Sequence, residues 1–588
     1  MNLKTLLEAE NADELKKRLA VLPLIPGRPK PTRKAQFIEE ITELMTPPFL
    51  KQYWEEMDDC EKNAIRETIY SLHGHFNHDQ FFAKYKVYPN FFEKHEARYR
   101  SEQKFLLFGA LFFDYCLPDE IIQSFRSFAS KPEADKIHSS TIDTESQLRT
   151  VSTEYAAQTE LHGLLRLLET KKLKASEKTG DASGATIQSI ANKLYGGDFY
   201  TEADEDPSEW ADKIGAIRAF AWPQILMTGK LINLNGNTLQ LTPQGKKALN
   251  GESIHLTLKI LWERWLQHAK DEFRRISIIK GQTGKGGKRC FTKASDRRTL
   301  IAKALQDLPL EKWVTFDELS RYMQSTCPQF SVTHGDPWDL YICDREYGSL
   351  GYDGYHGWNI LEERYILCLL FEYAATLGLI DIAYVSPIDA RRDYRGMWGT
   401  DELSFLSRYD GLRYVKLNSL GAYCLGLCKD YTLHNTKQPH CSLELTHNGY
   451  LTVTSPAVVP LDMASLLDLF ASRETQTSWK ISSESLLNAQ NSGHSLDLLT
   501  GLLDKHAVDL PASMATLFDE LSFKSMQLKK AGTAIMVECS SPEVADFFST
   551  HPKLKRFCYR MAPLILGIPE ENFAKCQTEM KKLGYPLR

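Results

Sequence analysis

The chain has 588 residues, with 71 lysines and arginines against 76 aspartates and glutamates, and therefore a net charge of −5. At roughly 100–200 residues per domain, this length predicts three to five domains. With 43% hydrophobic and 25% charged residues, the composition excludes a wholly disordered chain, a membrane protein and a histone-like polycation, whereas nucleic-acid binding stays open because it depends on where the charges lie.

The N-terminus and the longest apolar stretch bear on the compartment. No apolar signal-peptide core precedes the first charged residues, which predicts a protein that is not secreted. The stretch 365–385 is interrupted by Glu372 and Asp381, and Gly378 is typical of a helix end, so we expect a buried helix that leads into a strand instead of a membrane span. The twelve scattered cysteines are typical of reduced thiols, so a cytoplasmic protein without membrane contact is expected.

Residues 1–130 are expected to form a helical domain. Apolar residues recur at helical spacing on both sides of a proline-rich loop, at Leu15, Leu19 and Leu22 and then at Phe37, Ile38, Ile41 and Leu44. Residues 16–38 contain seven bases and no acid. Two short helices joined by such a basic loop resemble the SAP motif, a small DNA-binding hairpin, although a plain hairpin with solvated lysines explains the pattern equally well. DNA contacts from this loop are predicted for Arg28, Lys30, Arg33 and Lys34.

Residues 131–255 are expected to form a winged-helix domain. Helical segments are followed by a strand-like stretch, another helix and then a hairpin, in which Asn235 and Gly236 lie between two alternating strands. In a winged helix one helix can enter the major groove while the wing contacts phosphates. Many winged helices bind only protein, so the fold leaves both functions open. Residues 201–212 hold six acids and no base, and a solvated loop is expected there.

A second winged-helix domain is expected at 299–440. It begins with a helix–turn–helix pattern in which Trp313, Val314 and Phe316 supply a short core strand, and it ends with a strand that leads into a last helix. This last passage is similar to the one that ends the first domain and is the nearest approach to an internal repeat. The tyrosines and glycines of 347–358 suit base stacking, but packing against the neighbouring helix is the favoured interpretation.

Residues 441–588 alternate strands and helices and carry 14 bases and 16 acids. This pattern predicts a compact α/β domain without a nucleic-acid footprint. The expected fold class is therefore a multidomain protein, mainly α with α+β parts: a helical SAP-like N-terminus, two winged-helix domains and a C-terminal α/β domain.

The strongest electrostatic feature is the segment 274–298, hereafter the basic segment, which lies in a connecting region at 256–298. It has nine bases and one acid, a net charge of +8, which leaves −13 for the rest of the chain. Glycines 281, 284, 286 and 287 predict a flexible loop whose amides can approach an oxyanion. Bases that neutralise phosphates make binding depend on salt. We expect DNA or RNA contacts from Arg274, Arg275, Lys280, Lys285, Lys288, Arg289, Lys293, Arg297 and Arg298.

Nucleotide hydrolysis is not expected from this segment. A Walker A loop needs a lysine and then a serine or threonine after its second glycine. Counted from Gly281, Gly286 fits, but Gly287 stands in place of the lysine and Lys288 in place of the hydroxyl residue.

Three clusters contain metal-ligating residue types, but none has the spacing of a known site. The first cluster consists of His73, His75, His78 and Asp79. It has Asn77 where a common zinc hydrolase motif has aspartate, so we expect a cluster of surface side chains and no metal site. Buried free thiols are expected at Cys424 and Cys428, which are followed by His434, His440 and Cys441. The third cluster consists of His334, Asp336, Asp339 and Asp344, and the spacing of these residues does not indicate a particular catalytic mechanism. The sequence predicts no catalytic residue, metal or cofactor.

Several C-terminal phrases resemble the N-terminal, helicase-associated region of XPB-type helicases, namely LTHNGYLTVTSPAVVPLDMASLLDLFAS, LPASMATLFDEL, AIMVECSSPEVADFFS and EMKKLGYPLR. The central phrases KGQTGKGGKR, LYICDREYGSLGY and LSRYDGL resemble bacterial helicase-associated, winged-helix proteins that lack the motor. The resemblance covers about half of the chain. It implies DNA engagement and docking to partner subunits. Unwinding is not implied, because neither motor domain is present.

The sequence therefore predicts a non-enzymatic, DNA-binding accessory protein that acts with a helicase or nuclease in DNA repair or in defence against foreign DNA. The expected ligand is duplex or forked DNA with weak sequence preference, because phosphate contacts position a protein without specifying a sequence. Two alternatives stay open: a protein–protein scaffold whose winged helices bind partners, and a metal-dependent enzyme that uses the histidine or aspartate clusters.

Overall fold

The computed structural model describes residues 2–23, 25, 27–93, 104–143, 147–170, 172–205, 213–250, 253–353, 357–431, 442–455, 459–527 and 532–587. They form two compact units. The first unit consists of Met1–Ser442 and Ser455–Leu466, and the second unit of Leu443–Thr454 and Leu467–Arg588. Both units are rich in helices and contain only small sheets, as expected for a multidomain, mainly α protein.

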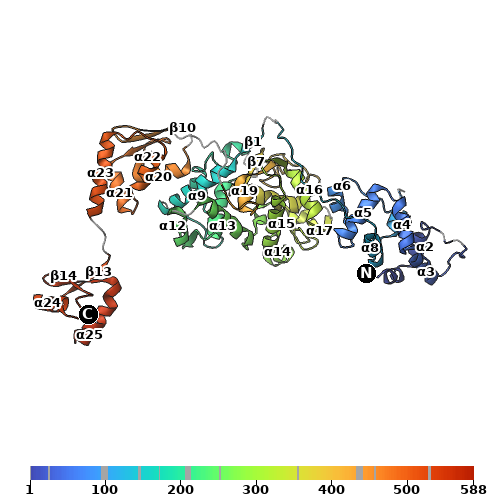
Figure 1. Cartoon of the computed structure of the whole chain (residues 1–588), viewed down its shortest axis with the longest axis horizontal. Helices are drawn as coiled ribbons and strands as arrows, with labels where there is room; N and C mark the ends of the chain where they lie inside the picture. The colour runs from blue at the N-terminus through green and yellow to red at the C-terminus, as the bar shows by residue number, and fades with distance from the viewer. Residues whose placement is uncertain are drawn as a thin grey trace. The chain divides into compact units, whose positions relative to one another are not determined.

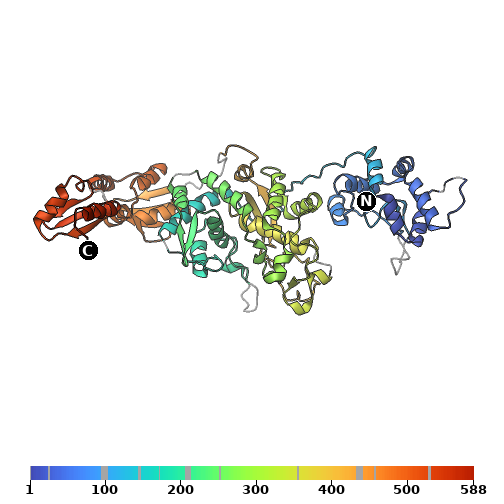
Figure 2. The ribbon, with the colours of Figure 1, turned by 90° about the horizontal axis from the view of Figure 1, so that it is seen from below.

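The first 130 residues form a helical bundle with an apolar core of its own. Leu7, Ile41 and Phe108 are fully buried in this core, and Figure 2 shows the bundle in blue. The expected helices are present, and the two helices of the basic hairpin, α2 and α3, contact each other. The bundle contains α1 (Leu3–Ala9), α2 (Ala12–Leu19), α3 (Lys34–Leu44), α4 (Pro47–Glu56), α5 (Asp59–Tyr70), α6 (His78–Tyr85), α7 (Leu107–Ala110) and α8 (Asp119–Arg126).

Residues 153–250 follow the element order expected for a winged helix. The elements are α9 (Thr153–Thr170), α10 (Gly184–Ala191), α11 (Arg218–Thr228), β2 (Ile232–Asn235), β3 (Thr238–Leu241) and α12 (Pro243–Asn250). The hairpin turn is Gly236-Asn237 instead of Asn235-Gly236, because Asn235 pairs with Thr238 and Gly236 takes the positive φ of 57°. Lys174 bridges Thr238 on the other side of β3, so β3 lies between the strand-like 173–175 and β2.

The next part of the chain repeats this order. Its elements are α15 (Ala294–Gln306), β5 (Trp313–Thr315), α16 (Phe316–Thr326), a third helix made of η5 (Asn359–Glu363), α18 (Arg364–Cys368) and η6 (Leu369–Ala374), then β7 (Ile380–Tyr384), β8 (Leu412–Leu417) and α19 (Ser419–Cys424). Strand β8 lies between β5 and β7, and β1 (Arg149–Val151) extends the sheet beyond β7. The helix-to-strand prediction for 365–385 is confirmed, since the whole stretch is buried. None of the helices in the described ranges has the length and apolar character needed to cross a membrane.

The last helices of the two segments approach their sheets in the same way. A Cβ atom added to Gly245 of α12 would lie 2.0 Å from the carbonyl oxygen of Leu231, which directly precedes β2. A Cβ atom added to Gly421 of α19 would lie 1.9 Å from the carbonyl oxygen of Leu379, which directly precedes β7. Both approaches therefore require glycine. This shared detail extends the repeat that the sequence indicates.

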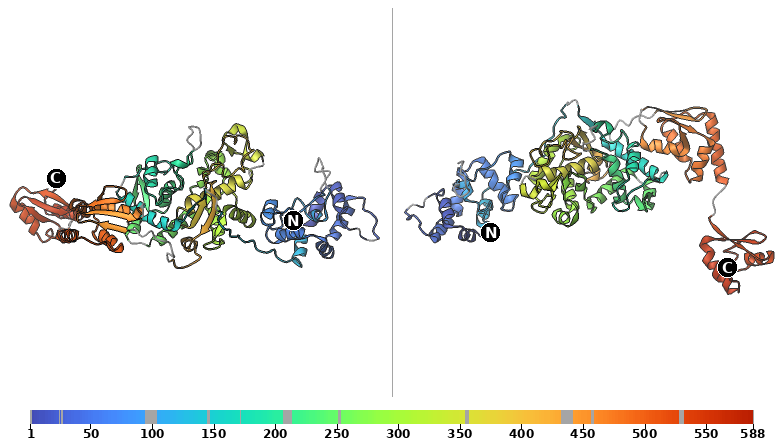
Figure 3. Two further views of the ribbon diagram at one scale, coloured as in Figure 1. Left: turned by 90° about the horizontal axis from the view of Figure 1, so that it is seen from above. Right: turned by 180° about the vertical axis from the view of Figure 1, so that it is seen from behind.

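One continuous apolar core joins the segments 153–250 and 294–424, and Figure 3 shows their green and yellow elements side by side in both views. Both third helices lie inside this core. In α11 the side chains of Ala219, Trp222 and Ile225 are fully buried. Helix α11 contacts η6 and α13 (Ile254–Gln267). Both third helices are thus covered by protein in the first unit.

The second unit contains two small sheets with the expected alternation of strands and helices, and many of its elements are labelled in Figure 1. The first sheet has the order β11-β12-β10-β9 and the second the order β13-β15-β14. The elements in this region are β9 (Ser442–Leu445), β10 (Tyr450–Ser455), α20 (Leu461–Phe470), β11 (Ala471–Arg473), β12 (Ser478–Ile481), α21 (Ser483–Asn491), α22 (Asp497–Lys505), α23 (Ala512–Gln527), β13 (Ala534–Glu538), α24 (Pro542–Thr550), β14 (Tyr559–Ala562), β15 (Ile565–Pro569) and α25 (Phe573–Lys582).

Candidate nucleic-acid interface

The basic segment is an ordered part of the first unit, so the expectation of a flexible loop is wrong. The segment runs through η3 (Glu272–Arg275), β4 (Ile279–Lys280), α14 (Gly284–Cys290) and the start of α15. Strand β4 pairs with β6 (Tyr341–Ile342). Gly281 and Gly284 have φ values of 85° and 92°, and a Cβ atom on Gly281 would lie 1.9 Å from the carbonyl oxygen of Asp339. These glycines permit turns and a close backbone approach.

Arg298, one of the predicted phosphate contacts, is completely buried. Its guanidinium donates to both carboxylate oxygens of Glu272, at 2.5 and 2.8 Å. It also donates to the carbonyl oxygens of Trp265 in the last turn of α13 and of His268 and Lys270 just after it. Five donors therefore meet five acceptors. The side chain holds the end of α13 and has no donor left for DNA.

Arg275 and Arg297 are also occupied inside the protein. Arg275 forms an ion pair with the buried Glu372 of η6 at 2.9 Å and donates to the carbonyl oxygen of Ala216 at the start of α11, so it links the two third helices. Arg297 is 1% exposed and pairs with Asp271. Together with Arg298, these two arginines cannot reach a phosphate at the surface without breaking the core.

The remaining bases of the segment lie at the surface. Arg274 is 42% exposed and pairs with Asp181 at 3.1 Å. The side chain of Lys288 lies outside the described residues. One carboxylate is close to this surface, since a Cβ atom on Gly286 would lie 2.7 Å from Oδ2 of Asp339. Four side chains are exposed and have no ion pair within the described part of the chain, namely Lys280, Lys285, Arg289 and Lys293.

The predicted contacts of the N-terminal hairpin are exposed, but two of them have partners. Arg28 pairs with Glu43 at 2.6 Å, and Lys34 donates to the carbonyl oxygen of Glu8 at 2.7 Å. Lys30 and Arg33 are exposed. The hairpin therefore presents four basic side chains, of which one is neutralised by an acid.

The histidine and cysteine clusters show no arrangement for metal binding among the described residues. His78 packs against the rings of Phe76, Phe91 and Tyr115, and burial lowers its pKa. Cys424 is buried, but Cys428 is exposed, so the prediction of two buried thiols is wrong for the second; His434, His440 and Cys441 lie outside the described residues. Across the described ranges, no group of three or more histidine, cysteine, aspartate or glutamate residues is placed to hold a metal ion.

The acidic stretch 201–212 is not simply a solvated loop. Asp204 is 5% exposed and pairs with Arg149. Glu205 accepts hydrogen bonds from the backbone amides of Ile214 and Gly215, at 2.8 and 2.9 Å. Residues 206–212 lie outside the described residues. Glu205 therefore organises the backbone that precedes α11, and Asp204 holds Arg149 of β1.

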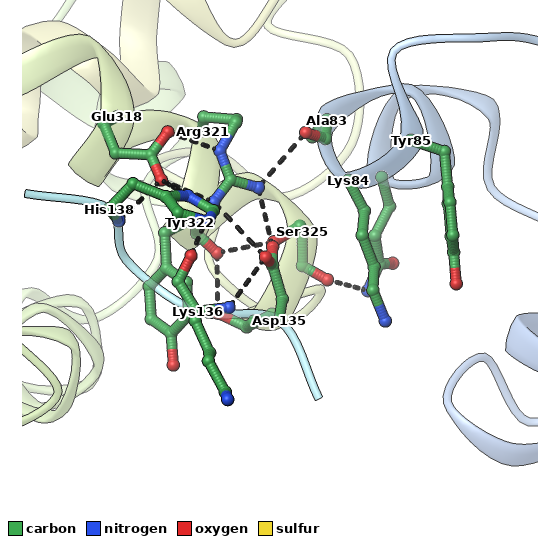
Figure 4. A network of polar contacts seen from close by, with 12 residues as sticks. Ala83, Lys84, Tyr85, Asp135, Lys136, His138, Glu318, Arg321, Tyr322 and Ser325 are labelled. Carbon is green, nitrogen blue, oxygen red and sulfur yellow. Dashed lines mark hydrogen bonds and ion pairs between the residues drawn. The ribbon is translucent and has the colours of Figure 1, made fainter. Parts of the chain in front are cut away.

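Arg321 of α16 is the centre of a polar network that joins the N-terminal helices to the segment 294–424, and Figure 4 shows it between Glu318 and Asp135. Its guanidinium donates to Asp135 Oδ2 at 2.7 Å and to Glu318 Oε2 at 2.7 Å. It also donates to the carbonyl oxygen of Ala83 in α6 at 3.3 Å. This network could not be predicted from the sequence, because Asp135 and Arg321 are 186 residues apart.

This network predicts a specific pH dependence. Burial raises the pKa of Glu318, but hydrogen bonds from Arg321 and His138 outweigh it and lower the pKa to about 2. The stabilising contribution is therefore complete above the ordinary glutamate pKa and is lost as the pH falls towards 2. We expect Glu318→Gln to lower the melting temperature at pH 7 and to have little effect near pH 2, as measured by scanning fluorimetry.

A matched variant controls for general acid effects. Glu520→Gln removes a carboxylate that is 58% exposed and whose ion pair with Lys524 is long, at 3.4 Å, so it should change the melting temperature little at either pH. Equal effects of Glu318→Gln at both pH values would show that the charge on Glu318 does not stabilise the network.

No model of a known protein family matches this sequence, and no curated protein matches it. The resemblance to XPB-type helicases thus stays a hypothesis. The structure itself provides an element order that fits two winged helices, a buried position for both third helices and a small exposed basic surface on and around β4 and α14.

Proposed function

We propose that this chain is a non-enzymatic, DNA-binding accessory protein. The observation that carries the proposal is the exposure of Lys280, Lys285, Arg289 and Lys293 within fourteen consecutive residues, without an ion pair in the described ranges. Each lysine or arginine that neutralises a phosphate releases counterions and so contributes to affinity. We name these four side chains the basic face.

Weak sequence preference follows from the placement of the third helices. Base edges are read by side chains that enter a groove, and in both winged-helix segments the helix used for this purpose lies inside the shared core. The basic face is left to contact the DNA backbone, which is the same for every sequence. The element order of both segments supports the winged-helix assignment.

The proposed partner is a helicase or nuclease, in DNA repair or in defence against foreign DNA. The support for this partner is the resemblance of the C-terminal phrases to the helicase-associated region of XPB-type helicases. An accessory chain of this kind holds DNA for an enzyme that acts on it. The chain itself then needs no catalytic residue.

The salt dependence of DNA binding tests the basic face. Replacing Lys280, Lys285, Arg289 and Lys293 together with alanine removes four phosphate contacts. The slope of log Kobs against log salt concentration should then become shallower by about 3 to 4 on duplex or forked DNA, since each contact contributes about 0.9. Fluorescence anisotropy of a labelled duplex between low and moderate salt measures this slope.

The control is a fourfold variant of exposed lysines elsewhere, at Lys51, Lys312, Lys505 and Lys524, which changes the net charge equally. It should leave the slope nearly unchanged. If the wild-type chain binds no duplex, forked or single-stranded DNA at low salt, or if both variants reduce the slope equally, the proposed function is wrong.

A further inference from the structure

Among the described residues, helices α24 and α25 cover one face of the sheet of strands β13, β15 and β14, and no helix covers the other. Leu566 and Ile568 of β15 point into a small core with residues of α24 and α25, and both are fully buried. Because side chains alternate along a strand, the residues between them face the other side. The register places Met536, Gly567 and Tyr559 in one row across this second face.

This second face is open. Met536 is 67% exposed, Tyr559 57% and Met561 62%. Met561 lies at a register shift in β14, between Arg560 and Ala562, and covers Gly567, where an added Cβ atom would be 2.3 Å from the methionine sulfur. Because β15 lies between β13 and β14, the row runs from Met536 to Gly567, which the side chain of Met561 covers, and ends at the ring of Tyr559 on β14.

The chain that enters β14 is basic. Residues 551–569 contain no acid, and Lys553, Lys555 and Arg556 are exposed between the end of α24 and the start of β14. Arg560, next to Tyr559, forms an ion pair with Asp546 at 3.2 Å. Three positive side chains without an ion pair in the described ranges thus lie within six residues of Tyr559 along the chain.

We propose that this open face binds single-stranded nucleic acid, with a base stacked on Tyr559 and backbone phosphates held by Lys553, Lys555 and Arg556. Aromatic side chains in a positively charged setting are the recognised arrangement for single strands, because every base has a stacking face. A duplex hides these faces between its base pairs. The bases that precede β14 lie in a stretch, 551–569, without an acid, and this stretch is complementary to a polyanion.

This proposal goes beyond the basic face, from which it is separate in the chain and in the unit that carries it. The two sites have different ligands: phosphates of a duplex or fork for the basic face, and an unpaired strand for the open sheet. An accessory protein with both sites would hold a junction at which duplex becomes single strand.

The test measures binding of a labelled oligothymidylate to the full chain by fluorescence anisotropy. Tyr559→Ala should weaken binding about tenfold, and Tyr559→Phe, which keeps the ring, should bind like the wild type. The matched control is Tyr450→Ala, which removes a 42% exposed tyrosine from the other sheet of the same unit and should have no effect. Far-ultraviolet circular dichroism verifies that each variant is folded.

Two further variants test the bases beside β14 and the independence of the open face from the basic face. Lys553, Lys555 and Arg556 changed together to alanine should make the salt slope shallower by about 2, since each phosphate of a single strand contributes about 0.7. The fourfold variant of the basic face should lose duplex binding and keep the effect of Tyr559→Ala on the oligothymidylate, which separates the two proposals.

Three results would overturn the open-face site. They are unchanged oligothymidylate affinity in Tyr559→Ala, equal losses in Tyr559→Ala and Tyr559→Phe, and competition by polyglutamate as strong as by unlabelled oligothymidylate. The last result would assign the surface to an acidic protein partner, because polyglutamate has negative charges but no base to stack.

Discussion

Replacing Arg298 with alanine is expected to lower the free energy of unfolding of the first unit by about 3–5 kcal/mol, because it leaves the buried carboxylate of Glu272 without its positive partner. Tyr365 and Trp265 still donate to that carboxylate, at 3.0 and 3.2 Å, but neither supplies charge. The carbonyl oxygens of Trp265, His268 and Lys270 lose their donor as well. Arg298→Lys should recover only part of the loss, since an ammonium cannot reproduce the planar fork.

Hydrogen exchange of peptides from 254–275 at increasing urea concentration measures this effect. Arg274→Ala is the matched control in the same segment, because its ion pair with Asp181 is 42% exposed on the arginine side and should contribute less than about 1 kcal/mol. Replacing both Arg298 with methionine and Glu272 with leucine should destabilise less than Arg298→Ala alone. Equal effects of Arg298→Ala and Arg274→Ala would contradict a structural role for Arg298.

In the basic segment, the positive charge could be predicted from the sequence, but the acids that pair with its arginines could not. Counting residues correctly identifies the positive stretch, but the acids that occupy Arg275 and Arg298 are far away or outside the counted window. Glu372 is 97 residues from Arg275, and Glu272 lies 26 residues before Arg298. A net charge summed over 25 residues contains no information on such pairs.

The helices, the hairpin and the short strands of 153–250 and 294–424 were predictable because their signals are local. A helix period, a turn with glycine and a short alternating strand each lie within a few residues. The burial of α11 had a signal too: RAFAWPQILMT is apolar on all sides, which is typical of a core helix and unsuited to a DNA groove. The exposure of the open sheet face had no signal in the sequence, because Met536 and Met561 are apolar residues, which are expected inside a core.

The fit of the last helix against the sheet leads to the second large effect. We expect Gly421→Ala to lower the free energy of unfolding of the first unit by about 3 kcal/mol, at the upper end of the usual cost of overpacking. The added Cβ atom would lie 1.9 Å from the carbonyl oxygen of Leu379, and a backbone atom cannot rotate away as a side chain does. Gly245→Ala should behave similarly, because its Cβ atom meets the carbonyl oxygen of Leu231 at 2.0 Å.

Gly501→Ala is the control, since Gly501 lies inside α22 with nothing within 4 Å of an added Cβ atom. Alanine there should stabilise the second unit by about 0.5–1 kcal/mol through its higher helix propensity. Urea titrations with hydrogen exchange read out peptides of α19, α12 and α22 in the same samples. If Gly421→Ala lowers the free energy of unfolding and Gly501→Ala raises it, then close packing, and not helix propensity, requires glycine at 421. A stabilising Gly421→Ala would contradict the close approach of the last helix to its sheet that the segments 153–250 and 294–424 share.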